Sequence, residues 1–194
     1  MTKIYFVRHA KADFSIKDNL IRPLTEDGKN DSKQVTEFLL KCNITKIFSS
    51  PYKRSIDTIK ELSDRLGLQI NIIDDFRERK VGNEWIEDFD KFAKEQWNDF
   101  HYKLSNGESL YEVQKRNISA IQDILDENIN ENIVIGTHGT ALSTIINYYN
   151  KDFNYNEFER IKELMPFIIC ISFDGEDVVK IEEFQLKCEK IEIV

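Results

Sequence analysis

Short apolar runs with the composition of β-strands alternate along this chain with longer segments whose apolar residues recur every three to four positions. Parallel strands must be joined by crossover connections, which are usually helices, so this alternation favours a sheet covered on both faces. We therefore expect an α/β fold: a three-layer sandwich with a mostly parallel central sheet, helices on both faces and a C-terminal β-hairpin. The expected strands are residues 3–7, 45–48, 69–73, 133–136, 167–173 and 177–183, and the expected helices are 26–42, 52–66, 86–103, 108–128, 139–149 and 155–164.

Local capping and turn signals support several of these boundaries. Ser50-Pro51 resembles a helix N-cap followed by proline at the first helical position, and Gly67 is placed to end the same helix. Asp174-Gly175, between two β-rich runs, predicts a tight hairpin turn. Neither a repeat nor a linker interrupts the pattern, so we expect residues 1–194 to form a single domain.

Charge and hydropathy narrow the functional classes. The formal net charge of −8 argues against broad binding to nucleic acid or anionic membranes, because both need a basic surface. The apolar stretches are too short to cross a bilayer, and the first residues lack the pattern of a signal peptide. We expect a cytoplasmic protein that binds neither nucleic acid nor membranes, and the sequence leaves its oligomeric state open.

The number and spacing of the cysteines also favour a cytoplasmic protein. Cys42, Cys170 and Cys188 are odd in number and widely spaced, without a CxxC pair or a Cys/His cluster of zinc-ligand spacing. We expect reduced structural thiols, no metal site and no cofactor.

Two of the three histidines directly follow strand-like runs. His9 comes after Arg8 at the end of the first run, and His138 follows the run 133–136 within Gly-Thr-His-Gly. Ligands of open α/β sheets bind beyond the carboxyl ends of the strands. The helix expected to start at Gly139 offers N–H groups that favour phosphate. The pair of histidines predicts an enzyme that handles phosphate, whereas His101, inside a helical segment, is interpreted as structural.

Two charged segments are candidates for the same edge of the sheet. Arg54 falls in the first turn of a helix, where the helix dipole disfavours a cation unless an anion lies nearby. Its planar guanidinium group suits phosphate oxygens. Glu78 follows a strand and stands between Arg77 and Arg79, although this charged run by itself is equally compatible with a solvated surface.

Taken in order, these segments resemble the motifs of the histidine phosphatase superfamily, and most closely its phosphoglycerate mutase-like branch. Pro23-Leu24-Thr25-x-x-Gly28 is also similar to the family's segment leading into its first helix. The resemblance covers nearly the whole chain. The matching elements are Arg8-His9, Ser49 to Arg54, Glu78 to Gly82, Gly107-Glu108-Ser109 and Gly136 to Gly139.

The resemblance implies a metal-independent phosphatase that hydrolyses small phosphate monoesters through a phosphohistidine intermediate. His9 would be the nucleophile, attacking phosphorus through a neutral imidazole nitrogen. Charge on the equatorial phosphate oxygens would be held by Arg8, Arg54 and His138.

Glu78 would protonate the departing alkoxide and then act as the base that activates water. Because Arg77 and Arg79 should favour its ionised form, we expect the negative charge of the bound phosphate to offset them. Glu84 is the reserve candidate for the proton donor.

Some positions depart from the family pattern. Ala10 stands where a glycine usually follows the Arg-His pair, and Ser15 replaces the common asparagine six residues after His9. We assign Ser15, Thr25, Gly139 and Lys11 to phosphate or substrate binding, although for Lys11 taken alone an ordinary surface charge is the favoured interpretation.

The segment 83–107 carries aromatic residues at roughly helical spacing, and the resemblance implies a helical cap over the active site. The expected partner is a small phosphorylated metabolite. Two alternatives remain open: a phosphoglycerate mutase, and a non-catalytic regulatory module that binds phosphate. The short chain favours hydrolysis over mutase activity, and Glu78 favours a phosphate ester over a phosphohistidine protein as substrate.

Overall fold

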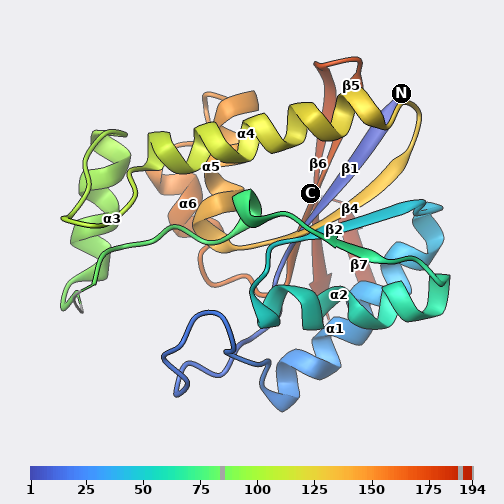
Figure 1. The fold of residues 1–194 in the computed structure, drawn as a ribbon, viewed down its shortest axis with the longest axis horizontal. Coiled ribbons are helices and arrows are strands. Elements are labelled where there is room, and N and C mark those ends of the chain that lie inside the picture. Colours follow the sequence, from blue (N-terminus) through green and yellow to red (C-terminus); the bar gives the residue numbers. More distant parts are fainter. Residues whose placement is uncertain (84–85, 188–189, 194) are drawn as a thin grey trace.

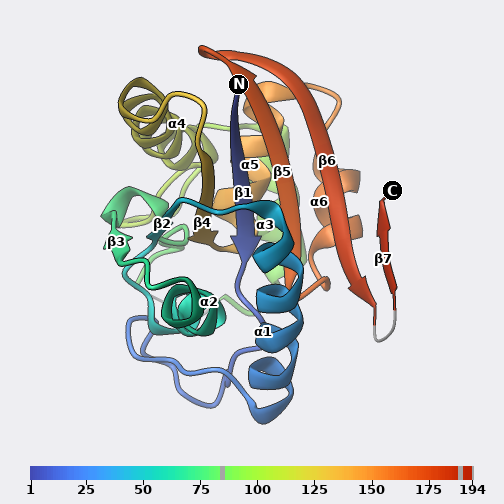
Figure 2. The ribbon, with the colours of Figure 1, turned by 90° about the vertical axis from the view of Figure 1, so that its right-hand side faces the viewer.

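The computed structural model describes residues 1–83, 86–187 and 190–193. Its strands form one seven-stranded sheet in the order β3-β2-β4-β1-β5-β6-β7. The strands β3, β2, β4 and β1 are parallel, whereas β5, β6 and β7 are each antiparallel to the preceding strand in the sheet (Figure 2). Their bounds are β1 Thr2–Arg8, β2 Lys46–Ser49, β3 Ile70–Ile72, β4 Asn132–Thr137, β5 Phe167–Asp174, β6 Asp177–Lys187 and β7 Lys190–Ile193.

Helices cover both faces of this sheet (Figure 1). One face packs against α1 and α2, the other packs against α4, α5 and α6, and α3 lies next to α6. The helices are α1 Glu26–Leu39, α2 Lys53–Leu66, α3 Phe89–Asn98, α4 Leu110–Glu127, α5 Gly139–Tyr149 and α6 Tyr155–Ile161, with short 3₁₀ turns η1 Leu40–Cys42 and η2 Asp74–Phe76. The expected three-layer α/β architecture is confirmed.

Alternation along β1 shows why the strand runs are continuously apolar. Ile4 and Phe6 point into the core beneath α4, α5 and α6, whereas Tyr5 and Val7 point into the core beneath α1 and α2. A strand that is buried on both faces needs apolar residues at every position. The described helices include none that is long and apolar enough to cross a membrane.

The turn and the helix C-terminus predicted from the sequence are confirmed, whereas the predicted helix N-cap is wrong. Gly67 ends α2 in the left-handed conformation, with φ of 66°, and a tight turn with Gly175 at φ of 60° joins β5 to β6, as expected. The predicted N-cap at Ser50 is wrong, because α2 begins at Lys53 and Tyr52 is its N-cap residue. Ser50 instead shares a 2.6 Å hydrogen bond with His138.

Other boundaries differ modestly. The first expected helix, 26–42, is α-helical only to Leu39, and α3 is shorter than the expected 86–103. The short strand β7, which follows the predicted hairpin, was not predicted from the sequence. Cys42 and Cys170 are free thiols, and Cys188 lies outside the described residues.

Close packing of α2 on β4 depends on Gly136. A Cβ atom at this position would lie 2.7 Å from Ser55 Oγ and 2.8 Å from Ser49 Oγ. The missing side chain therefore lets the first turn of α2, which carries Arg54, sit against the end of β4.

We predict that Gly136→Ala lowers the free energy of unfolding by about 1–3 kcal/mol, because the added methyl group overpacks this contact. Urea denaturation followed by circular dichroism measures the effect. Combining it with Ser55→Ala should recover part of the loss, since that change removes the nearer clash. An unchanged denaturation midpoint in Gly136→Ala would contradict this account of the packing.

Candidate active site

The register of the parallel strands brings the two histidines together. Arg8 pairs with Thr137 between β1 and β4, and the His9 N–H donates to the Thr137 carbonyl at 3.1 Å. The segments that follow β1 and β4 then leave the sheet side by side, at the carboxyl ends of these strands. The ring centres of His9 and His138 lie 5.3 Å apart, and a cavity of about 440 Å³ opens beside His9.

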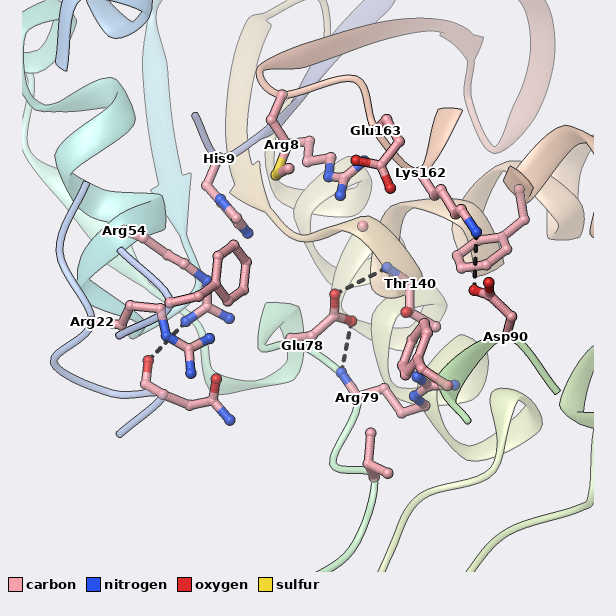
Figure 3. A pocket seen from close by; sticks show the side chains of 17 residues that line it. Arg8, His9, Arg22, Arg54, Glu78, Arg79, Asp90, Thr140, Lys162 and Glu163 are labelled. Carbon is pink, nitrogen blue, oxygen red and sulfur yellow. Dashed lines mark hydrogen bonds and ion pairs between the residues drawn. The ribbon is translucent and has the colours of Figure 1, made fainter. Parts of the chain in front are cut away.

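Figure 3 shows His9 pointing into this cavity, with charged residues from several segments around it. His9 Nδ1 lies 2.8 Å from the Ala10 carbonyl oxygen. A carbonyl only accepts hydrogen bonds, so Nδ1 carries the proton and Nε2 keeps its lone pair. Ala10 is itself held by a hydrogen bond from its N–H to Thr58 Oγ1, at 3.0 Å. The imidazole is thus oriented with its unprotonated nitrogen, Nε2, available to a ligand.

Burial and neighbouring cations keep His9 neutral. Burial, followed by the charge of Arg54 and then of Arg8 and Arg22, lowers the pKa of His9 to about 3, and only the hydrogen bond to Ala10 opposes them. An imidazole with this pKa is unprotonated at neutral pH, which is the form that attacks phosphorus.

His138 is fully buried behind His9 and does not itself line the cavity. Its Nε2 shares a hydrogen bond with Ser50 Oγ, and its ring lies 5.0 Å from the ring of Tyr52. Nδ1 has no hydrogen-bond partner among the described residues. Burial, the charge of Arg54 and that of His9 lower the pKa of His138 well below its usual value.

Arg8 and Arg54 are buried cations on the cavity wall. Arg8 Nη1 donates to the carbonyls of Ile161 and Leu164, at 2.8 and 3.1 Å. Arg54 Nη1 donates to the Asn19 carbonyl at 2.8 Å. Burial lowers the pKa of Arg54 to about 10, so it stays charged at neutral pH. Within the described part of the chain, the buried Nε atoms of both arginines lack partners.

Gly139 lines the cavity beside Arg8, where a Cβ atom would lie only 3.1 Å from Cζ of the guanidinium group. The glycine therefore lets Arg8 approach the start of α5 closely. Gly139 thus lies on the cavity wall, and its assignment to phosphate or substrate binding stays a prediction.

Glu78 occupies the N-terminus of α5. Its Oε2 accepts from the Thr140 N–H at 3.0 Å, and Oε1 accepts from the N–H groups of Ala141 and Arg79, at 3.1 and 2.8 Å. The expectation that this helix end offers open N–H groups to phosphate is therefore corrected at Thr140 and Ala141, where a carboxylate is already bound.

The arginines that flank Glu78 in sequence bind elsewhere. Arg77 donates to Glu108 and Asp74, both at 2.8 Å, and Arg79 donates to Gln96. Backbone N–H groups, rather than these two guanidinium groups, hold the Glu78 carboxylate. The reserve candidate Glu84 lies outside the described residues.

Three predicted binding residues do not line the cavity, because their side chains serve local structure. Ser15 Oγ donates to Asp13 at 2.6 Å. Thr25 is the N-cap residue of α1, accepting from the Gly28 N–H at 3.0 Å, and Lys11 forms an ion pair of 3.6 Å with Asp27. Thr25 directly precedes the helix that the sequence predicts from residue 26, which is the N-cap position, whereas the contacts of Ser15 and Lys11 have no such sign in the sequence.

The cavity is also lined by residues that the sequence did not predict. Arg22 and Asn19 reach the wall from the loop before α1, and Arg22 donates to the Ile16 carbonyl at 2.7 Å (Figure 3). The position of Arg22 directly before Pro-Leu-Thr was an available signal.

The far wall of the cavity joins α3 to the end of α6. Lys162 Nζ lies 3.0 Å from Asp90, in the first turn of α3, and 2.7 Å from Glu159. Arg79 is 7% exposed, and its guanidinium lies 5.4 Å from the ring centre of Phe89. Only the packing of α3 reveals these contacts. No group of three or more His, Cys, Asp or Glu residues suited to a metal ion occurs within the described ranges.

With this geometry in place, similarity to known proteins identifies the family. The family model of the histidine phosphatase superfamily (branch 1) matches residues 4–181, and the chain belongs to this superfamily. A curated relative, the putative phosphoserine phosphatase 2 of Hydrogenobacter thermophilus, is 28% identical over 158 residues, covering 75% of this chain and 77% of the relative.

Solved structures show the same fold. The YhfR structure from Bacillus stearothermophilus has a TM-score of 0.76 and 24% identity, covering 92% of this chain and 94% of that one. A phosphoserine phosphatase mutant from Entamoeba histolytica, in complex with phosphoserine, has a TM-score of 0.74 and 20% identity, covering 93% and 96%.

The buried neutral His9 makes stability depend on pH. Below about pH 6.5 the unfolded chain protonates this histidine, whereas the folded protein does so only near pH 3. The unfolded state binds more protons in that window, so stability falls as the pH drops.

Between pH 7.5 and pH 5 the free energy of unfolding of the unmodified protein falls. We predict that this fall is smaller by roughly 2 kcal/mol in His9→Gln, which lacks the buried imidazole. Chemical denaturation at several pH values in phosphate-free buffer measures it. His101→Gln, on the exposed surface, is the matched control. Parallel pH profiles of His9→Gln and the unmodified protein would show that His9 is not held neutral.

Proposed function

We propose that this protein is a metal-independent phosphatase that hydrolyses small phosphate monoesters through a phosphohistidine at His9. The observation that carries this proposal is a neutral, oriented imidazole beside buried, converging cations. The nucleophile and the oxygen-binding groups are thereby prepared before substrate arrives.

In the first step, His9 Nε2 attacks phosphorus in line with the ester oxygen. The new N–P bond forms as the P–O ester bond breaks, and its electron pair leaves on the alkoxide. Arg8, Arg54 and Arg22 are placed to neutralise the non-bridging oxygens. The Nδ1 proton stays on the ring, bonded to the Ala10 carbonyl, so the charge that His9 gains upon phosphorylation is delocalised.

Glu78 enters this step in its protonated form, which the negative charge of the bound phosphate favours, and it donates that proton to the leaving alkoxide. The resulting carboxylate then takes a proton from the water that attacks the phosphohistidine. Its carboxyl group lines the cavity beside the start of α5. Hydrolysis releases inorganic phosphate and restores neutral His9. His138 was expected to hold phosphate oxygens, but it does not line the cavity, so we assign it to supporting the neighbouring ring of His9.

The organic part of the substrate is placed against the far wall. We assign the segment 83–107 to a cap over this wall. In the part of the segment that the structure describes, Phe89 and Asp90 line the cavity, and Lys162 at the end of α6 pairs with Asp90. A volume of about 440 Å³ suits a small phosphorylated metabolite. Relatives named phosphoserine phosphatase support this substrate class, and the free thiols Cys42 and Cys170 support a cytoplasmic location.

We predict that the protein releases phosphate from 4-nitrophenyl phosphate, phosphoserine and 3-phosphoglycerate with a chelator present, and that His9→Ala lowers this activity at least about 10³-fold because no phosphoenzyme can form. Released phosphate is measured directly. His101→Ala, away from the cavity, should retain activity. Equal release by His9→Ala and the unmodified protein would exclude His9 as the nucleophile.

The same assay separates the alternatives. Relatives named probable phosphoglycerate mutase share 24–26% identity with the chain. A mutase would interconvert phosphoglycerates when primed with 2,3-bisphosphoglycerate and release little phosphate. A regulatory module would bind inorganic phosphate without a trappable phosphoenzyme.

We predict that Glu78→Gln lowers kcat for an alkyl phosphate such as phosphoserine by about 10²-fold, because a poor leaving group needs a proton donor. The effect on 4-nitrophenyl phosphate should be below about fivefold, because its leaving group is stable as an anion. Steady-state kinetics with both esters provide the comparison. Equal losses of kcat with the two esters would show that Glu78 is not the proton donor.

A further inference from the structure

Glu78 belongs to a segment without regular secondary structure. The 3₁₀ turn η2 ends at Phe76, and residues 77–81 lie in neither a helix nor a strand. The backbone hydrogen bonds of a sheet or helix therefore do not fix this stretch. Hydrogen bonds to other parts of the fold, from both side chains and backbone, therefore fix its position.

Arg116, on α4, holds the backbone on the N-terminal side of Glu78. Its Nη1 donates to the carbonyl oxygens of Asp75 and Arg77, the latter at 2.9 Å. One guanidinium nitrogen thus binds two carbonyls of the same short segment, and the other nitrogens bind Glu108. The side chain is only 10% exposed, so little water competes for these bonds.

Glu108 holds the backbone on the C-terminal side. Its Oε2 accepts from the Lys80 N–H at 2.8 Å, and its own N–H donates to the Lys80 carbonyl at 2.7 Å. Oε1 accepts from Arg116 Nε at 2.9 Å and from Arg77 Nη2 at 2.8 Å. Burial alone would raise the pKa of Glu108, but hydrogen bonds from Arg116 and the Lys80 N–H lower it, so the carboxylate is ionised at neutral pH.

Two further contacts tie this cluster to the fold. Gln96, fully buried on α3, donates to the Glu108 carbonyl at 3.1 Å and accepts from Arg79. Ser109 caps α4 in a reciprocal capping box with Glu112, which fixes the start of the helix that carries Arg116. The turns on both sides of Glu78 are therefore anchored to α3 and α4.

We propose that Arg116 and Glu108 are positioning residues for Glu78, holding its carboxyl group where it transfers a proton to the leaving alkoxide. This inference rests on the proposed function, in which Glu78 is the acid. Neither side chain lines the cavity, so both act through the backbone of residues 75–80. Proton transfer requires heavy atoms about 2.6–3.2 Å apart, so a small displacement of this segment removes the acid without altering His9.

The test uses Arg116→Lys, which keeps the charge but loses the planar fork, and Glu108→Gln, which keeps the shape but loses the carboxylate. Kinetics are measured with phosphoserine and 4-nitrophenyl phosphate, and thermal unfolding is followed in parallel. Arg160→Lys is the matched control, because Arg160 makes a comparable two-bond contact to Glu183, at 2.9 and 2.8 Å, and does not line the cavity.

We expect both variants to lose about tenfold or more in kcat for phosphoserine and less than about threefold for 4-nitrophenyl phosphate. Adding Arg116→Lys to Glu78→Gln should produce no further loss, since the acid is already absent. Hydrogen exchange at the Lys80 amide should accelerate in Glu108→Gln, whether or not turnover is measurable. Arg160→Lys should keep the native ratio of the two activities.

Two results overturn the proposal in distinguishable ways. If Glu78→Gln discriminates between the esters but Arg116→Lys and Glu108→Gln lose equally on both, the cluster only stabilises the fold, and the proposed function stands. If Glu78→Gln itself loses equal activity on the two esters, Glu78 is not the acid, and the positioning role of Arg116 and Glu108 is excluded with it. Should Arg116→Lys not fold, Glu108→Gln decides alone.

Discussion

Strands β1 and β4 pair in parallel, with Arg8 opposite Thr137, and this register brings His9 and His138 to the same edge of the sheet. Strand β2 pairs with β4 on the other side, with Ser49 opposite Gly136, so the chain that leads to Arg54 leaves at the same edge. A shift of one residue would turn every strand side chain to the opposite face. Continuous burial on both faces opposes such a shift, since each core is filled by a different set of side chains.

The concentration of cations at this edge has two linked effects. Arg8 and Arg54 are buried with incomplete hydrogen bonding among the described residues, which is unfavourable for the folded protein until an anion binds. The same charges lower the pKa of His9 and keep its imidazole unprotonated. In the proposed mechanism, one arrangement therefore both binds phosphate and keeps the nucleophile neutral. The backbone contact to Ala10 completes it by selecting the tautomer.

Glu78 is held by a different kind of interaction. Its carboxylate accepts three backbone N–H groups, two of them from the first turn of α5, and its own segment is anchored by Arg116 and Glu108. Glu78 and His9 thus depend on separate sets of contacts. This separation explains why changes at Arg116 or Glu108 are expected to affect proton transfer while leaving His9 in place.

The sequence by itself determined the α/β architecture and predicted Arg8, His9, Arg54 and Glu78 as site residues. The reason is that apolar strand runs alternate with helical segments along the chain, and polar residues follow the ends of those runs. It also led to the resemblance that family membership later confirmed. Only the tertiary structure decided which side chains meet at the cavity: Ser15, Thr25 and Lys11 turned to local partners, and Arg22 joined the wall. The physical reason is that a polar side chain in a loop can bond either to a neighbour two or three residues away, as Ser15 and Thr25 do, or to a distant segment, and the path of the folded backbone decides between them.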